Sequence, residues 1–517
     1  MIDVPDRTKR TPLLVAAALV LGAVLRIVQW SAGTSMWLDE LQIARNVRDR
    51  ALPALLFEPL DYRQMAPPGF LASVKAAVAT FGLDERALRL VPLLMGILAL
   101  LLLWRVAHRF VTGLPLAGVL LVSAASPALV WYSGNVKQYS GDVALSLLLV
   151  LLALRHVEQP MDTRRAGWAA ALGALAMISS YAAVLTGAVL GLVLLGHWLG
   201  RRRTGTFRPL GILGGGWLLG AVAAAWASLR LTDPAVREFM RDFHAAGFAP
   251  WKDGIVAVLL WIPGRVFNAL AHYMVFLEAE AGGLAIPVAI LALAGVAVVA
   301  SEERLKGMLL AAPLLAALLG GLTQTLPMRH RLAVYAGAPV LVFGMIGLQA
   351  LLARRSRWVQ GAGALLALLA IAPLPLVVLA MNRPPYRSQE TRPVLAALAE
   401  RMRADDAVYI YCPAVAAADF YGPTAGVTDY IAGGCHATEG ELIDELRALP
   451  EGRVWFFFTQ WTPGLPWPDT AQAFLANVGR EAERIDDPYG LTGQSDAAAI
   501  LYELPAADAP DRMARAP

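Results

Sequence analysis

The sequence predicts a mainly α-helical membrane protein that crosses the bilayer many times and carries a small α/β domain at its C-terminus. Between Thr11 and Met381, long apolar runs alternate with short polar links, and several runs reach the roughly 20 residues that cross a bilayer. From Asn382 onward the composition is ordinary. The chain of 517 residues is 57% hydrophobic and only 16% charged. Soluble domains average about 25% charged residues, so a wholly soluble fold is excluded.

Apolar length places the candidate spans, and we expect a polytopic helical bundle of about 11–13 spans. Two further apolar stretches are interrupted: Pro67-Pro68 opens residues 67–82, and Pro263-Gly264-Arg265 splits residues 255–277. Each could cross the membrane, re-enter it or lie at the interface. The uninterrupted candidates are 12–30, 88–106, 114–131, 142–156, 167–181, 183–199, 209–230, 283–300, 308–325, 333–352 and 358–381.

The basic residues predict the orientation. If neither interrupted stretch changes the count, alternating spans bring the basic links to one side, which we assign to the cytoplasm. Residues 12–30 are then the first span rather than a cleavable signal peptide. The net charge of +4 reflects topology, and nucleic-acid binding is not expected. The basic links contain Arg7, Lys9, Arg10, Arg105, Arg109, Arg155, Arg164, Arg165, residues 201–203, Arg304, Lys306, Arg354, Arg355 and Arg357.

The opposite, outer face receives the loop 31–66, the link 132–141, the turn 327–332 and the C-terminal domain. In that domain, helical patterns at 391–403, 438–448 and 469–482 alternate with strand patterns at 407–412, 454–459 and 498–503. We therefore expect a membrane domain over 1–381, an α/β domain over 382–505 and a disordered tail over 506–517. Cys412 and Cys435 form either a disulfide or two buried thiols, and spacing alone does not decide between them.

The strongest local signal is the acidic pair Asp39-Glu40 just past the first span. It could be a solvated loop end or the acidic first turn of a helix. A carboxylate here could also act as a general base for an acceptor hydroxyl.

Arg63 and the double proline Pro67-Pro68 follow in the same loop. A double proline does not fit inside a helix, so it marks a stiff start to the next apolar stretch. That structural role is enough to explain it.

The outer link 131–142 carries aromatic and charged residues between two apolar runs. Trp131 and Tyr132 suit an ordinary interfacial aromatic belt. Lys137 and Asp142 need more explanation, because they lie where a helix enters the membrane. The lysine could hold a phosphate, and the aspartate could hold a metal ion or orient a sugar.

The turn Arg329-His330-Arg331 places positive charge on the outer face, against the usual bias. Arginine matches phosphate oxygens with a planar fork of donors, so a lipid phosphate is its natural partner. Plain snorkelling toward headgroups is the structural alternative. The seven histidines are scattered, and the sequence contains no zinc motif, no nucleophile elbow and no Gly-rich phosphate loop.

Four elements follow one another on this polytopic chain: the acidic pair, the Ala66–Phe70 run with its double proline, the Lys137–Ser140 segment and the basic turn. In this order they resemble the GT-C superfamily of membrane glycosyltransferases. The resemblance covers about residues 10–381. It is nearest to the bacterial branch related to protein O-mannosyltransferases and the lipid A aminoarabinose transferase. Many relatives have an acidic residue and an arginine before the tyrosine, where this chain has Val136-Lys137-Gln138-Tyr139. The lysine keeps the charge but loses the bidentate fork.

The resemblance implies an inner-membrane enzyme that transfers one sugar from a polyprenyl-phosphate carrier on the periplasmic side. The acceptor would be lipid A, lipopolysaccharide, another glycolipid or a protein hydroxyl. No cofactor is certain, and a divalent metal is possible, with Asp39 and Asp142 as candidate ligands. Asp39 would be the catalytic base and Glu40 its support. The carrier would be bound by Lys137, Tyr139, Arg329 and Arg331, supported by Arg63, Pro67, Pro68, Asp142 and His330.

The chemistry is coherent without the family. A sugar–phosphate bond is already activated, so no nucleotide is needed, and direct displacement with inversion is expected. The main alternative is a transporter or flippase of lipid-linked sugars, which would show internal repeats and charges near the midplane. A ligase of whole glycans and a non-catalytic sensor are the others.

Overall fold

The computed structural model describes residues 7–159, 161–200, 207–275, 282–372, 385–459, 468–487 and 497–506. The chain divides into two compact units. The first, here called the membrane unit, comprises the residues up to Ala32 and Asp49–Pro385. The second, the C-terminal unit, comprises Gly33–Arg48 and the residues from Tyr386 onward. It therefore contains a piece of the first outer loop. Most of the predicted disordered tail, residues 507–517, lies outside the described residues.

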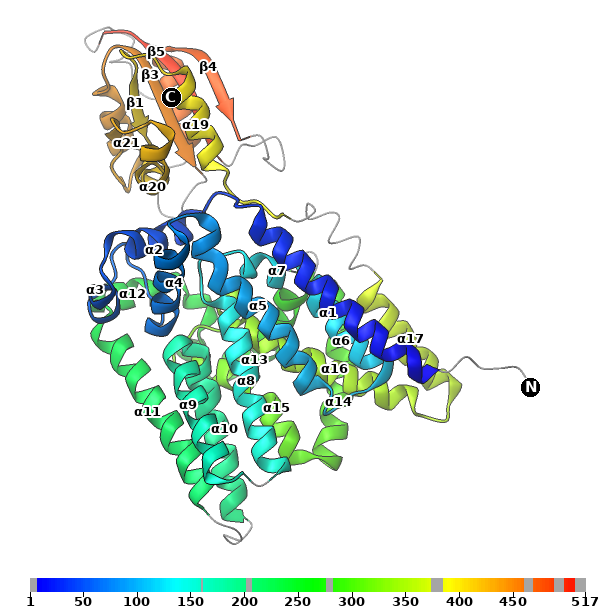
Figure 1. Cartoon of the computed structure of the whole chain (residues 1–517). Helices are drawn as coiled ribbons and strands as arrows, with labels where there is room; N and C mark the ends of the chain where they lie inside the picture. The colour runs from blue at the N-terminus through cyan, green and yellow to red at the C-terminus, as the bar shows by residue number, and fades with distance from the viewer. Residues whose placement is uncertain are drawn as a thin grey trace. The chain divides into compact units, whose positions relative to one another are not determined.

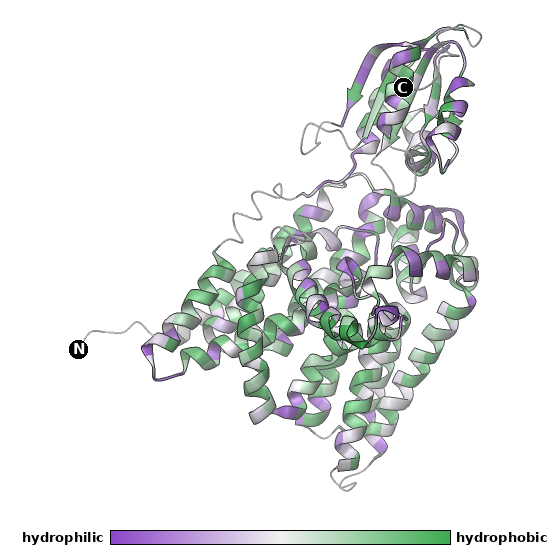
Figure 2. Cartoon of the chain, turned by 180° about the vertical axis from the view of Figure 1, so that it is seen from behind, coloured by the Kyte–Doolittle hydropathy of each residue, from purple (hydrophilic) through white to green (hydrophobic). Residues whose placement is uncertain are grey.

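The membrane unit consists of helices, as Figure 1 shows. Apolar residues dominate these helices, whereas the C-terminal unit is of mixed hydropathy (Figure 2). Of the described helices, eight are long and apolar enough to cross a membrane, which confirms the predicted multi-span, mainly helical class. They are α1 (Arg7–Ser31), α5 (Glu85–Ala107), α8 (Tyr139–Glu158), α10 (Tyr181–Gly200), α11 (Arg208–Arg230), α13 (Ile255–Val275), α15 (Arg304–Leu322) and η4 (His330–Ala336) joined to α16 (Gly337–Leu352).

Shorter helices complete the unit. A ninth span exists if the bent pair α6 (Gly113–Ala125) and α7 (Pro127–Ser133) crosses as one. The others are α3 (Leu52–Phe57), α4 (Pro68–Phe81), α9 (Thr163–Ser179), α12 (Pro234–Phe243), α14 (Ile286–Glu302) and α17 (Arg357–Ile371). Residues 373–384, which include the end of the last predicted span, lie outside the described residues.

The predicted continuous span 114–131 is wrong, because the chain bends by 54° at Ser126 between α6 and α7. Pro127 explains the break, since a proline disfavours the helical conformation of the residue before it. The break leaves backbone carbonyls of α6 without helical donors. The buried guanidinium of Arg26 in α1 donates to the carbonyls of Ser123 at 3.2 Å and Ala124 at 3.3 Å.

The predicted split of residues 255–277 is also wrong. α13 runs unbroken through Pro263 and is 21 residues long. A membrane helix tolerates an internal proline, because neighbouring groups satisfy the freed backbone carbonyl. Since α13 is long and apolar enough to cross the membrane, it belongs to the candidate spans. The other interrupted stretch becomes α4, for which Pro67 is the N-cap and Pro68 the first helical residue.

The C-terminal unit is built on a five-stranded sheet with the order β2-β1-β3-β5-β4. β1 (Ala407–Ile410) pairs in parallel with β2 (Ile431–Ala432) and β3 (Gly452–Thr459). β5 (Ala497–Leu504) runs antiparallel to β3 and to β4 (Arg480–Asp486). The three predicted strands are confirmed. Trp455, Phe456 and Tyr409 are fully buried in and around the sheet.

Four described helices accompany the sheet: α19 (Thr391–Arg401), α20 (Val415–Ala425), α21 (Glu439–Arg447) and α22 (Pro468–Val478). The predicted helix 469–482 is wrong at its end, since the chain leaves the helix at Val478 and enters β4. β4 is an edge strand rich in alternating charges, a composition typical of exposed edges. α20 is a helix that the sequence did not indicate.

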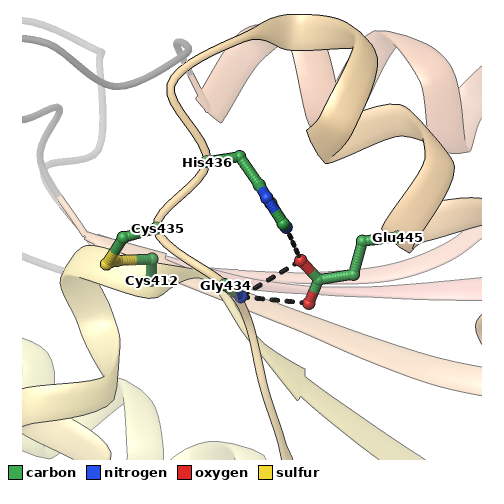
Figure 3. The surroundings of a disulfide bond; sticks show 5 residues. All are labelled: Cys412, Gly434, Cys435, His436 and Glu445. Carbon is green, nitrogen blue, oxygen red and sulfur yellow. Dashed lines mark hydrogen bonds and ion pairs between the residues drawn. A yellow bond between two sulfur atoms is a disulfide. The ribbon is translucent and has the colours of Figure 1, made fainter.

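Cys412 and Cys435 form a disulfide, which settles the alternatives that spacing left open. Their Cα atoms lie 5.2 Å apart, within the usual range. Figure 3 shows the surroundings: the carboxylate of Glu445 contacts the imidazole of His436 and accepts hydrogen bonds from the backbone N–H of Gly434. The disulfide and this carboxylate together fix the segment between β2 and α21.

Candidate active site

The acidic pair forms the first turn of α2 (Leu38–Asp49), in the C-terminal unit. The helix begins at Leu38, and the two carboxylates in its first turn interact favourably with the helix dipole. Asp39 is half-buried and Glu40 is only 1% exposed. One of the structural readings of the pair, an acidic first turn, therefore holds.

Lys137 lies in the membrane unit, in the link between α7 and α8. Its side chain is buried, and its Nζ donates to Oε1 of Gln64 at 2.8 Å. Gln64 follows Tyr62 and Arg63, whose positive φ angles of 61° and 53° turn the loop sharply. This hydrogen bond orients the ammonium group.

Arg63 itself points elsewhere. Its side chain is exposed, and its guanidinium lies 5.1 Å from the ring centroid of Phe239 in α12. That cation–π contact joins the outer loop to a short amphipathic helix. Arg63, Pro67 and Pro68 thus shape the loop before α4.

Asp142 occupies the first turn of α8 and is buried. The hydroxyl of Ser180, next to the start of α10, donates to its Oδ1. Its charge also acts on Tyr335 in η4, so it lies near the turn that carries the basic residues. Within the described ranges, no group of three or more His, Cys, Asp or Glu side chains is placed to hold a metal ion. The hydrogen bond from Ser180 links Asp142 to the start of α10.

Four aromatic rings connect the start of α8 to η4. The ring centroids of Tyr139 and Tyr132 lie 5.1 Å apart in an edge-to-face arrangement. The hydroxyl of Tyr132 is hydrogen-bonded to Nε2 of His272 at 2.7 Å, and His272 stacks on His330 at 5.9 Å. Tyr132 is buried, so its predicted role in an interfacial belt is wrong. The rings tie the Lys137 link to the basic turn.

The charges of three arginines act on His330. Arg329 lies just before η4, and its Nε contacts Nε2 of His330 at 3.3 Å. The charges of Arg329, Arg331 and Arg265 all act on His330, and those of Arg265 and Arg329 act on each other. With His272, these residues form what we call the basic cluster. All except the buried His272 are half-buried.

The cluster shows two signs of a binding site. In the described part of the chain, Nε of Arg265 is buried and has no hydrogen-bond partner. His330 adopts a positive φ of 43°, which is unusual for a residue with a side chain. Like charges held close together in a partly dry place repel each other, and an anion between them would relieve that repulsion. Planar guanidinium groups are suited to a phosphate.

Gly247 packs against the basic turn. The carbonyl of Gly247, after α12, accepts a hydrogen bond from the backbone N–H of Met328 at 2.8 Å. A Cβ added to Gly247 would lie 2.8 Å from Cβ of Pro327 and 3.0 Å from Cβ of Arg329. Only glycine lets the two segments approach this closely, so this contact holds Arg329 in position.

The structure thus places Lys137 just before α8, Tyr139 at the start of α8, and Arg329 and Arg331 at the start of η4, with aromatic rings linking Tyr139 to His330. Sequence analysis missed Arg265 and His272 as members of the basic cluster, and it missed Gln64 as the partner of Lys137. Arg265 and His272 are seven residues apart on α13 and so share one face of that helix. Two ionisable residues on one face of an apolar helix indicate a functional site. This signal was missed because residues 255–277 were interpreted as split.

The chain matches no protein-family model and no curated protein sequence. Among solved structures it is similar to the archaeal oligosaccharyltransferase AglB from Archaeoglobus fulgidus, over 96% of this chain and 75% of that one, at 13% identity and a TM-score of 0.46. It is also similar to ArnT from Cupriavidus metallidurans, over 95% and 97% of the two chains, at 16% identity and 0.41. The arabinofuranosyltransferase AftD from Mycobacteria is matched over 95% of this chain and 40% of that one, at 15% identity and 0.46. AglB and AftD are sugar transferases by name, and each of the three TM-scores lies below 0.5.

Proposed function

We propose that this protein is a membrane glycosyltransferase of the GT-C type that transfers a single sugar from a polyprenyl-phosphate carrier to an acceptor hydroxyl. The observation that carries the proposal is the basic cluster, in which the charges of Arg265, Arg329 and Arg331 act on His330 and the buried Nε of Arg265 has no hydrogen-bond partner among the described residues. A phosphate is the anion that this arrangement of planar donors fits best.

The cluster would act on the leaving group. As the bond between the sugar carbon and the phosphate oxygen breaks, its electron pair passes to that oxygen, and the carrier changes from a phosphodiester to a phosphomonoester with one more negative charge. Cations held at that position stabilise the transition state more than the ground state. Arg265 and Arg329 would bind the phosphate, and Lys137 would add a third charge from the link before α8.

Asp39 would act on the acceptor. Its carboxylate takes the proton of the acceptor hydroxyl while the hydroxyl oxygen attacks the sugar carbon. A single displacement of this kind inverts the configuration at that carbon. Glu40 would hold the start of α2 in place.

The proposed location is the bacterial inner membrane, with the C-terminal unit in the periplasm. The Cys412–Cys435 disulfide supports that side, because disulfides persist in oxidising compartments. The acceptor would be lipid A, lipopolysaccharide, another glycolipid or a protein hydroxyl.

The test combines cells and purified protein. Envelope glycolipids and glycoproteins of a deletion strain are compared by mass spectrometry with those of strains carrying the wild type, Asp39→Asn or Glu58→Gln. We expect the deletion to lose an increment of one sugar, which the wild type and Glu58→Gln restore and Asp39→Asn does not. Glu58 is a matched control, since it lies in the same outer loop and its side chain is 63% exposed.

Binding is measured on the same purified chains in nanodiscs, with undecaprenyl phosphate as the probe and native mass spectrometry as the readout. Arg265→Gln and Arg329→Gln should weaken binding, whereas Asp39→Asn and the exposed control Arg304→Gln should not. Full restoration of the sugar by Asp39→Asn would refute the base. Loss of the sugar in the deletion strain with lipid-linked sugars retained on the cytoplasmic face, and its restoration by Asp39→Asn, would favour the transporter or flippase instead.

A further inference from the structure

The C-terminal unit contains the helix that bears Asp39. Gly33–Arg48, encoded at the beginning of the chain, belongs to the same compact unit as the sheet domain encoded at its end. Hydrogen bonds and ion pairs between these two parts lie on both sides of Asp39 in the sequence. The sheet domain of the C-terminal unit therefore holds the segment that carries the candidate base.

The contacts after Asp39 converge on Asp419 in α20. Its Oδ2 forms ion pairs with Nε of Arg45 at 2.7 Å and with a terminal nitrogen of Arg48 at 2.8 Å. Arg48 also donates to the backbone carbonyl of Asp419 at 3.0 Å and lies 5.5 Å above the ring of Phe420. Arg45 and Arg48 are three residues apart, so they lie on one face of α2. One carboxylate thus holds that face against α20.

The contacts before Asp39 come from α19 and α20. The buried carboxylate of Glu390 accepts from the backbone N–H of Ser35 at 3.3 Å and from its hydroxyl at 3.1 Å. The hydroxyl of Tyr421 accepts from the backbone N–H of Met36 at 2.8 Å. A terminal nitrogen of Arg392 donates to the carbonyl of Gly33 at 3.0 Å. The chain is therefore held just before α2 begins.

We infer that the C-terminal unit positions the general base, with Asp419 as the principal positioning residue. α2 is a single rigid helix of 12 residues, so fixing the chain at Met36 and at Arg45 fixes the direction of Asp39 between them. The inference rests on the proposed function, because it gives Asp419 a catalytic consequence only if Asp39 is the base. A misplaced base lowers the rate of the chemical step more than it weakens donor binding.

The experiment uses the full chain in nanodiscs and compares Asp419→Asn with Asp419→Glu and with Asp444→Asn. Asp444 pairs with Arg447 on α21 and is 74% exposed, so its substitution is a matched control. Hydrogen exchange of residues 38–48 is measured by mass spectrometry beside steady-state transfer kinetics. Asp419→Asn should speed exchange of α2 and lower kcat, each by about 10- to 100-fold, the range for losing a charged hydrogen bond. KM for the donor should change by less than about twofold.

Asp419→Glu should restore most of both properties, and Asp444→Asn should change neither. If Asp419→Asn does not fold, Tyr421→Phe removes the bond to Met36 and should raise exchange of α2 in the same region. Unchanged exchange in a folded Asp419→Asn variant overturns the inference whatever the activity. Faster exchange with an unchanged kcat, while Asp39→Asn is inactive, also overturns it and leaves the proposed function intact. A fully active Asp39→Asn overturns the proposed base, and the exchange data still report whether α2 is anchored.

Discussion

Nζ of Lys137 donates a hydrogen bond to Oε1 of Gln64 at 2.8 Å, and both side chains are buried. The bond to Gln64 orients the ammonium group, and a cation at this position suits an anionic phosphate. Lys137→Met should therefore raise KM for the polyprenyl-phosphate donor about 10- to 100-fold, the effect of removing a charged hydrogen bond. Transfer kinetics at varied donor concentration provide the measurement.

Two companion variants sharpen that prediction. Lys137→Arg keeps the charge and should recover most of the donor affinity. Lys306→Met removes a lysine that pairs with Glu303 on α15 and should leave KM unchanged. A donor KM in Lys137→Met equal to that of the wild type would remove Lys137 from the donor site.

Gly247→Ala should weaken donor binding through the basic turn. The added Cβ would lie 2.8 Å from Cβ of Pro327 and 3.0 Å from Cβ of Arg329, so the turn has to move. Overpacking of this kind costs about 1–3 kcal/mol. Binding of undecaprenyl phosphate, measured by native mass spectrometry, should fall accordingly. Gly215→Ala in α11, where an added Cβ meets nothing within 4 Å, should bind normally; a matching loss there would point to a general effect.

Arg26→Leu should destabilise the membrane unit. The substitution leaves the carbonyls of Ser123 and Ala124 without the guanidinium that satisfies them at the break between α6 and α7. Each buried carbonyl left unpaired costs about 1–3 kcal/mol. Thermal unfolding of the detergent-solubilised protein, followed by tryptophan fluorescence, should occur at a lower temperature. Arg105→Leu, which removes an exposed arginine at the end of α5, should unfold as the wild type does. Equal unfolding temperatures for the wild type and Arg26→Leu would contradict the capping role.

The C-terminal unit should lose part of its stability in acid through Asp406. Burial opposes ionisation of this carboxylate, but hydrogen bonds from Arg453, the backbone of Arg403 and Trp455 outweigh it, so the pKa of Asp406 lies below its ordinary value. A pKa lowered by folding contributes stability that is present above the unfolded pKa of about 3.9 and is lost as the pH falls through the folded pKa.

Asp406→Asn should therefore lower the unfolding temperature of the C-terminal unit near neutral pH, and the difference from the wild type should shrink below about pH 4. Unfolding scans of the full chain across that pH range give the measurement. Asp444→Asn, on the exposed surface of α21, should follow the wild type throughout. A difference that stays constant down to the lowest pH would exclude ionisation of Asp406 as the cause.

The sequence predicts those features that are written in local patterns. The strands around Val454 and Ala498 follow from short apolar runs, and Lys137 and Arg329 stand out as charges at the ends of apolar runs. The break at Ser126 was missed because the run across it is apolar throughout, so only Pro127 could have signalled it. The opposite error occurred at Pro263, where a proline lies inside a continuous helix. A proline therefore does not by itself show where a membrane helix ends, since packing can satisfy the freed carbonyl.

The sequence does not show that α2 belongs to the C-terminal unit. α2 is held by Asp419, and no short-range pattern links Arg48 to a residue that lies 371 positions further along the chain. α20 was missed for a related reason: it is short, rich in alanine and contains Pro423. Its identity as a helix depends on packing against α19 and on the ion pairs with α2.

The pairing of α2 with the end of the chain also sets an order of assembly. Arg48 leaves the ribosome 371 residues before Asp419, which at about 5–20 residues per second is roughly 20–70 s of synthesis. Throughout that interval the segment around Asp39 lacks the carboxylate, the tyrosine hydroxyl and the arginine that later hold it. Docking of this segment is therefore a closing step of biogenesis, and a nascent or truncated chain can complete its membrane helices while its acidic helix is still unanchored.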